Sequence, residues 1–132
     1  MENIIQAKKL TKVYGEKETS VTALDNVDVQ FNENEFTAIM GPSGSGKSTL
    51  LHCLAGLDRP TSGQILLKDQ DISTLNDKQL TKIRRDSFGF VFQAFNLIPT
   101  LTAEENITLP ASIAGRKPDM DWIKQVVETV DI

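Results

Sequence analysis

The chain has 132 residues, of which 39% are hydrophobic and 24% are charged, a composition typical of a soluble domain with one core. Its net charge of −4 at pH 7 argues against a protein that binds nucleic acid through its overall charge. The single cysteine, Cys53, excludes a disulfide framework within the chain, and no apolar run reaches the roughly 18 residues that a membrane span requires. We therefore expect a soluble protein of a reducing compartment.

The first 40 residues predict β-structure. Residues 4–14 and 21–31 are rich in β-branched and apolar side chains and predict two strands, with a polar turn at residues 15–18. A second polar turn at residues 32–35 precedes a short and mostly apolar segment, residues 36–40. This last stretch predicts a buried strand.

A helix is predicted directly after a glycine-rich loop. Residues 47–55 contain no Gly or Pro, and their periodicity places Leu50, Leu51 and Leu54 on one apolar face. Residues 64–67 predict a further strand.

The second half of the chain predicts three helices and one more strand. A helix starts at residues 76–79, and residues 88–92 form a compact apolar strand. Residues 102–105 are a capping box for a short helix, which Pro110 is expected to end. Apolar residues recur at helical spacing from Pro118 onward and predict the last helix.

The glycine-rich loop carries the clearest functional signal. Residues 41–48 match the pattern G-x-x-x-x-G-K-[ST] at every fixed position, between a predicted strand and a predicted helix. Glycines let the backbone take a positive φ and approach an anion, and the helix N-terminus adds positive charge. Lys47 would then bridge the β- and γ-phosphates of a nucleotide, and the Ser48 hydroxyl would ligate Mg²⁺. The alternative is a flexible turn without a ligand.

Residues outside the loop extend this candidate site. Tyr14 ends the first predicted strand, where its ring can stack on a purine for about 1 kcal/mol, or can simply lie at the rim of the core. Gln93 follows the strand predicted at residues 88–92, where its amide oxygen can ligate Mg²⁺ or bond to the backbone. The predicted nucleotide-binding residues are Tyr14, Gly41, Pro42, Ser43, Gly44, Ser45, Gly46, Lys47, Ser48 and Thr49, and the predicted metal ligands are Ser48 and Gln93.

Four stretches of the chain resemble the ATP-binding subunits of ABC transporters. They are residues 10–15, 41–48, 54–63 and 90–97, and the resemblance extends over essentially the whole chain. Residues 96–106 look most like the branch that drives lipoprotein release and the export of macrolides or antimicrobial peptides.

That resemblance implies an α/β fold, a P-loop NTPase (ABC ATPase) core with an N-terminal antiparallel β subdomain. Residues 1–94 would form the β subdomain and the first part of the nucleotide-binding core, and residues 95–132 the start of a helical subdomain. Tyr14 would stack on the adenine of ATP, the loop would hold the phosphates, and Gln93 would ligate Mg²⁺.

The resemblance also implies the partners. A transmembrane permease would contact the segment from Phe95 to Thr102, and a second ATP-binding subunit would complete an ATP sandwich. We expect no nucleic-acid partner. The protein would be cytoplasmic, peripheral on the inner face of the membrane, and would use MgATP to power export or release of a substrate through its permease.

The chain departs from the family at several positions. Asn34 and Asp69 stand where the family usually has turn glycines, and both residue types tolerate a positive φ. The family continues with a Ser-Gly-Gly-Gln signature, a strand ending in Asp-Glu and a switch histidine, which the residues after Thr49 do not supply. We therefore expect the N-terminal part of a longer protein, truncated before the signature and second acidic motif, which binds ATP but hydrolyses it poorly.

Two alternatives remain open from the sequence. One is a soluble ABC-type ATPase of translation or DNA repair, and the other is a non-hydrolysing nucleotide-binding regulator. The short spacing from Gln93 to Ile132 and the exporter-like residues 96–106 favour the transporter. The transported substrate is not readable from these residues.

Overall fold

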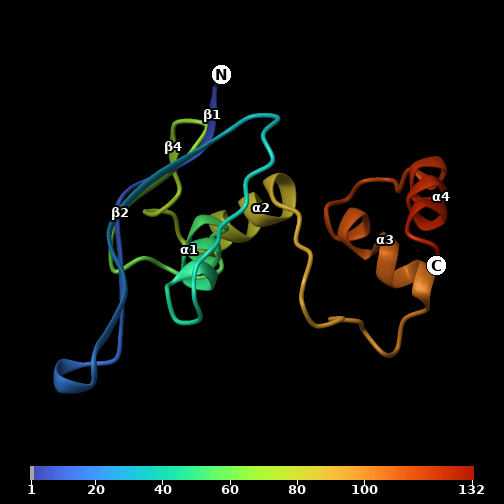
Figure 1. Cartoon of the computed structure of the whole chain (residues 1–132). Coiled ribbons are helices and arrows are strands. Elements are labelled where there is room, and N and C mark those ends of the chain that lie inside the picture. The colour runs from blue at the N-terminus through green and yellow to red at the C-terminus, as the bar shows by residue number, and fades with distance from the viewer. Residues whose placement is uncertain (1) are drawn as a thin grey trace. The chain divides into compact units, whose positions relative to one another are not determined.

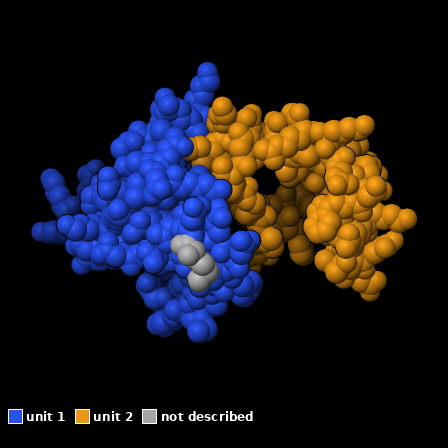
Figure 2. Space-filling model, turned by 90° about the horizontal axis from the view of Figure 1, so that it is seen from above, with its two compact units in different colours: residues 1–81 blue, residues 82–132 orange. Residues whose placement is uncertain are grey.

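The computed structural model describes residues 2–132. They form two units, one that ends at Thr81 and one that begins at Lys82 (Figure 2). The first unit contains the strands and the glycine-rich loop, and the second contains the two C-terminal helices.

The first unit contains a four-stranded antiparallel sheet with the order β2-β1-β3-β4 (Figure 1). In β1 and β2 the register pairs Tyr14 with Val21 and Asn3 with Asn32. The 3₁₀ turn Lys17–Thr19 connects these two strands. The sheet confirms the strands predicted from residues 4, 21 and 64. The strand bounds are β1 Asn3–Tyr14, β2 Val21–Asn32, β3 Ser62–Leu67 and β4 Gln70–Asp71.

The core lies between this sheet and helix α1, Lys47–Leu54. Leu50 and Leu54 are buried as predicted, whereas Leu51 is half exposed, so its predicted place on the apolar face is wrong. Cys53, three residues after Leu50, takes that place and is fully buried. The buried side chains of the core are Ala7, Leu10, Leu24, Leu50, Cys53, Leu54, Ala55, Ile65, Ile72 and Leu80.

Two turns have the conformation that their residue types predict. Asn34 has a φ of 58° and Asp69 a φ of 66°, both in the left-handed region. Asn and Asp tolerate this region better than other residues with a side chain, so the turns form without glycine. Both substitutions for the usual turn glycine are therefore structurally accommodated.

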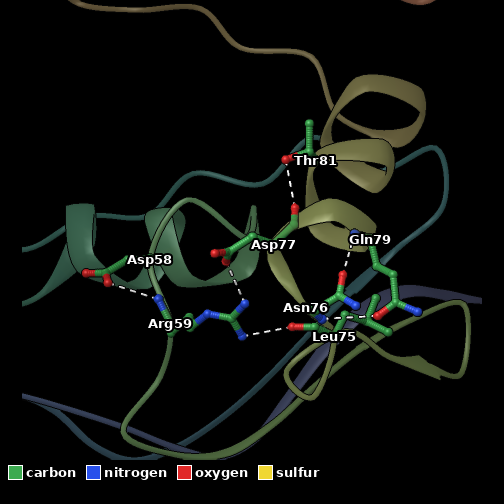
Figure 3. Close-up of polar contacts among 7 residues, drawn as sticks. All are labelled: Asp58, Arg59, Leu75, Asn76, Asp77, Gln79 and Thr81. Carbon is green, nitrogen blue, oxygen red and sulfur yellow. Dashed lines mark hydrogen bonds and ion pairs between the residues drawn. The ribbon is translucent and has the colours of Figure 1, made fainter.

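Helix α2, Asp77–Ser87, begins where the sequence predicts, with a reciprocal capping box. The Gln79 amide N–H donates to Asn76 Oδ1 (2.9 Å), and the Asn76 amide N–H donates to Gln79 Oε1 (3.1 Å). Arg59 fixes the same helix start, because its guanidinium donates to the Leu75 carbonyl and to Asp77 Oδ1, both at 2.8 Å (Figure 3).

The second unit contains helices α3, Ala103–Ile113, and α4, Met120–Thr129. Thr102 caps α3 as predicted, accepting from the Glu105 amide at 3.1 Å. The prediction that Pro110 ends this helix is wrong, because Pro110 lies inside it. Proline removes only its own N–H, and the next turn is held by bonds such as that from the Ala114 amide to the Pro110 carbonyl (3.1 Å).

Two predicted strands, residues 36–40 and 88–92, are not strands in the structure. Both segments are irregular, and Phe36 is 99% exposed. A strand requires a hydrogen-bonded neighbour, and neither segment pairs with another strand in the part of the chain that the structure describes. In the second segment the rings of Phe90 and Phe92 stack with their centroids 5.8 Å apart. The two segments therefore contain residues that favour strands, but the apolar pattern does not specify the neighbouring strand with which they would pair.

The close packing of β1 against β3 predicts a strong effect of Gly63→Ala. Gly63 has a φ of 92°, and a Cβ there would lie 2.4 Å from the Lys9 carbonyl oxygen. We expect the variant to lose about 2 kcal/mol or more of unfolding free energy, measured by urea denaturation followed by circular dichroism. The control is Gly89→Ala, where φ is not positive and no heavy atom lies within 4 Å. Equal urea midpoints for the two variants would contradict the packing described.

Candidate functional site

The glycine-rich loop wraps around the side chain of Lys47. The Lys47 ammonium donates to the carbonyls of Gly41 (2.6 Å) and Pro42 (2.8 Å) and to Ser45 Oγ (3.2 Å). The Ser45 amide closes a turn on the Pro42 carbonyl at 3.2 Å. The loop therefore forms a ring of oxygen acceptors around a positive charge.

Two glycines are needed for this loop, for different reasons. Gly46 has a φ of 93°, and a Cβ on it would lie 2.6 Å from the Ala23 carbonyl oxygen and 3.2 Å from Leu24 Cδ2. The loop is thus pressed against β2 at this point. Gly44 has a φ of 81° but faces open space, so only its backbone conformation requires glycine.

The N-terminus of α1 faces the loop without a side-chain cap. Its N-cap residue is Gly46, which has no side chain to accept the first amide hydrogens, and its first turn contains no acidic residue. The partial positive charge of the helix end is therefore not neutralised locally. The Lys47 ammonium adds a full positive charge at the same place.

An open cavity of about 640 Å³ lies over the loop and the start of α1. It brings Tyr14, at the end of β1, together with the loop and with Lys47 and Ser48. Gly41, Pro42 and Ser45 do not line it. The lining residues are Tyr14, Val21, Thr22, Ala23, Ser43, Gly44, Gly46, Lys47, Ser48 and Thr49.

Three of the lining residues, Val21, Thr22 and Ala23, were not predicted from the sequence. They belong to β2, and the register places Val21 opposite Tyr14. These three residues line the cavity because β2 pairs with β1 beside Tyr14, and not because of their residue types. Only a correct prediction of the β1–β2 register would have identified them as lining residues.

The Tyr14 ring is held by Asp58 and Lys12, two residues that were not predicted as site residues from the sequence. Its hydroxyl donates to Asp58 Oδ2 at 2.7 Å, and the Lys12 ammonium lies 4.9 Å from the ring centroid. Lys12 also pairs with Asp58 Oδ1 at 3.0 Å. The hydrogen bond to the Asp58 carboxylate raises the pKa of Tyr14, and the same bond, with help from Lys12, lowers the pKa of Asp58.

Gln93 belongs to the second unit and does not line the cavity. It is exposed in the irregular segment between α2 and α3. Further along this segment, Phe95 and Leu97 are exposed as well.

The end of that segment is organised by one side chain, Asn106 of α3. Asn106 Oδ1 accepts from the Ile98 amide at 2.8 Å, and its Nδ2 donates to the carbonyls of Ile98 (3.2 Å), Leu101 (3.3 Å) and Thr102 (2.9 Å). In the sequence Asn106 is the last residue of the exporter-like stretch 96–106, and no pattern there predicts these bonds. Its four bonds to the main chain hold residues 98–102 against the start of α3.

A metal centre and a membrane-spanning helix are both absent from residues 2–132. No group of three or more His, Cys, Asp or Glu side chains lies together there as a metal centre. Within the same residues no helix has the length and apolar character to cross a membrane.

The chain is similar in sequence to proteins of one known family. The family model described as "ABC transporter" matches residues 24–132. The macrolide export ATP-binding/permease protein MacB of Marinobacter nauticus is 47% identical over 115 residues, which are 87% of this chain and 18% of that protein. The lipoprotein-releasing system ATP-binding protein LolD of Cytophaga hutchinsonii is 45% identical over 116 residues, covering 88% of this chain and 51% of LolD.

A solved structure is similar as well. The ATP-binding cassette MJ0796, in a dimeric post-hydrolysis state bound to ADP and Pi, aligns with a TM-score of 0.82 and 46% identity. The alignment covers 94% of this chain and 54% of that one. The chain thus spans about half the length of these ATP-binding proteins, and less of MacB. Because the family model matches well over half of its residues, this chain belongs to the ABC transporter family.

Proposed function

We propose that the cavity binds MgATP, with the adenine on Tyr14 and the phosphates on residues 41–48. The observation that carries the proposal is a single cavity lined by Tyr14, Lys47 and Ser48 together. An aromatic ring, a cation and an uncapped helix N-terminus suit the base and the phosphates of a nucleotide. The bound ADP and Pi of the similar MJ0796 cassette support this ligand class.

Lys47 is the proposed partner of the β- and γ-phosphates. Its acceptors are the carbonyls of Gly41 and Pro42 and the Ser45 hydroxyl, all of them neutral groups. A phosphate oxygen carries negative charge and is the stronger acceptor for an ammonium. Binding would therefore exchange neutral partners of the Lys47 ammonium for charged ones.

Ser48 and Gln93 are the proposed ligands of Mg²⁺. Both offer neutral oxygen atoms, which suit a hard cation that keeps water and phosphate ligands. The phosphate oxygens of the nucleotide would supply further ligands to the ion.

We further propose that this chain holds ATP without hydrolysing it efficiently. None of the described residues that line the cavity is a carboxylate or a histidine. Hydrolysis requires a group that orients and deprotonates the attacking water, beyond the charge that holds the phosphates. Binding and hydrolysis would thus depend on different parts of the whole protein.

The biological role we propose is that of the energy-supplying part of a membrane exporter or release system. The relatives MacB and LolD bear the names of a macrolide export and a lipoprotein-releasing protein, which supports this class of transport. A permease would bind the segment from Phe95 to Thr102 and keep the protein on the inner face of the membrane. A second ATP-binding subunit would complete the site, in agreement with the dimeric MJ0796 structure.

We also propose a division of the chain in family terms. Residues 1–94 would supply the β subdomain and the first part of the nucleotide-binding core. Residues 95–132 would begin the helical subdomain, which contains α3 and α4.

Lys47→Ala tests the nucleotide site. We expect the Kd for MgATP to rise at least about tenfold, because a charge-assisted contact to the phosphates is lost. Isothermal titration calorimetry measures the effect. Lys8→Ala is the matched control, since Lys8 is exposed on β1 outside the cavity. Equal affinities of the Lys47 variant and the unchanged protein would refute the phosphate site.

The separation of binding from hydrolysis gives a second test. We expect the 132-residue chain to release phosphate from MgATP at no more than a trace rate, because the cavity offers no residue to activate water. A continuous phosphate-release assay measures the rate. Ordinary turnover that disappears in Lys47→Ala would show that the chain contains its own base, and the proposal of poor hydrolysis would be wrong.

A further inference from the structure

The Tyr14 side chain is anchored by contacts that involve Asp58 and Lys12. Its hydroxyl donates to Asp58 Oδ2 (2.7 Å), Asp58 Oδ1 pairs with the Lys12 ammonium (3.0 Å), and that ammonium lies 4.9 Å from the Tyr14 ring centroid. Tyr14 remains 42% exposed and lines the cavity, whereas Lys12 does not line it. The ring is therefore fixed at its hydroxyl end while part of it stays accessible from the cavity.

Asp58 is itself attached to the helix that begins at the phosphate loop. Its amide donates to the His52 carbonyl in the last turn of α1 at 3.2 Å. Its Oδ1 accepts from the Arg59 amide at 2.9 Å, and the Lys12 ammonium donates to the Arg59 carbonyl at 2.7 Å. The Asp58–Arg59 contact belongs to the network at the start of α2 (Figure 3).

These contacts connect the Tyr14 side chain to α1, the helix whose N-terminus lines the cavity. The helix has eight residues, about 12 Å of length, with the phosphate loop at its N-terminus and Asp58 beyond its C-terminus. A ring bonded to Asp58 is held at a set distance from Lys47. Without that bond the Tyr14 ring would be free to adopt other rotamers at the end of its strand.

We propose that Lys12 and Asp58 are positioning residues that hold the Tyr14 ring where a purine base can stack on it. Neither residue touches the nucleotide in this arrangement. The inference rests on the proposed function, because stacking presupposes a nucleotide whose phosphates lie on residues 41–48. In this proposal the Tyr14 hydroxyl anchors the side chain, and the Tyr14 ring stacks on the base.

The Kd values of two ligands separate an effect on base stacking from an effect on phosphate binding. MgATP contains the base, whereas magnesium tripolyphosphate offers only the phosphates. We expect Asp58→Asn, Lys12→Met and Tyr14→Phe each to raise the Kd for MgATP about threefold to tenfold, the range of one weakened stacking contact. The Kd for tripolyphosphate should stay within about twofold. Asp25→Asn, an exposed carboxylate on β2 away from the cavity, is the control.

Each other outcome overturns the inference in a recognisable way. If the three variants bind MgATP as tightly as the unchanged protein, the anchor has no role in base binding. Equal weakening of both ligands would mean that Asp58 supports the fold and not the ring. If the unchanged protein binds neither ligand, the proposed function fails and the inference fails with it.

A spectroscopic readout reports the anchor directly. Tyr14 is the only tyrosine of the chain, so the near-ultraviolet absorbance of phenolate titrates this residue alone. Its pKa lies above the ordinary value because Asp58 accepts its hydrogen, and we expect Asp58→Asn to lower that pKa whereas Asp25→Asn leaves it unchanged. Circular dichroism at each pH verifies that the fold persists. An identical titration in Asp58→Asn would contradict the anchor.

Discussion

The close approach of Gly46 to β2 is the contact on which the site depends. A Cβ at this position would lie 2.6 Å from the Ala23 carbonyl oxygen, so only glycine lets the start of α1 approach the strand this closely. Because β2 pairs with β1, the same contact relates Lys47 to Tyr14. The cavity that contains both residues is thus a consequence of one backbone approach between a helix and a hairpin.

The side chains that line the cavity are of types that suit the binding of a phosphorylated ligand. Its lining contains a cation, hydroxyls, glycines and an aromatic ring, and among the described residues it contains no acid. The Asp58 carboxylate, which does not line the cavity, accepts a hydrogen bond from Tyr14 and pairs with Lys12. Its negative charge is therefore compensated by Lys12 in a local ion pair and does not directly repel a phosphate.

Local signals in the sequence predicted the local features of the fold. The two long strands, the capping boxes at Asn76 and Thr102, and the positive φ at Asn34 all follow from neighbouring residues. The failures concern partners remote in the sequence. Residues 36–40 are apolar enough for a strand but form none. The hydrogen bond from Tyr14 to Asp58 joins residues 44 positions apart, and no sequence pattern predicts it. Pairing and packing decide such features, and composition alone does not contain them.

The four hydrogen bonds of Asn106 have a mechanical consequence. They attach the backbone of residues 98–102 to the first turn of α3 through a single side chain. Displacing the main chain of residues 98–102 relative to the helix would therefore require several of these hydrogen bonds to break together.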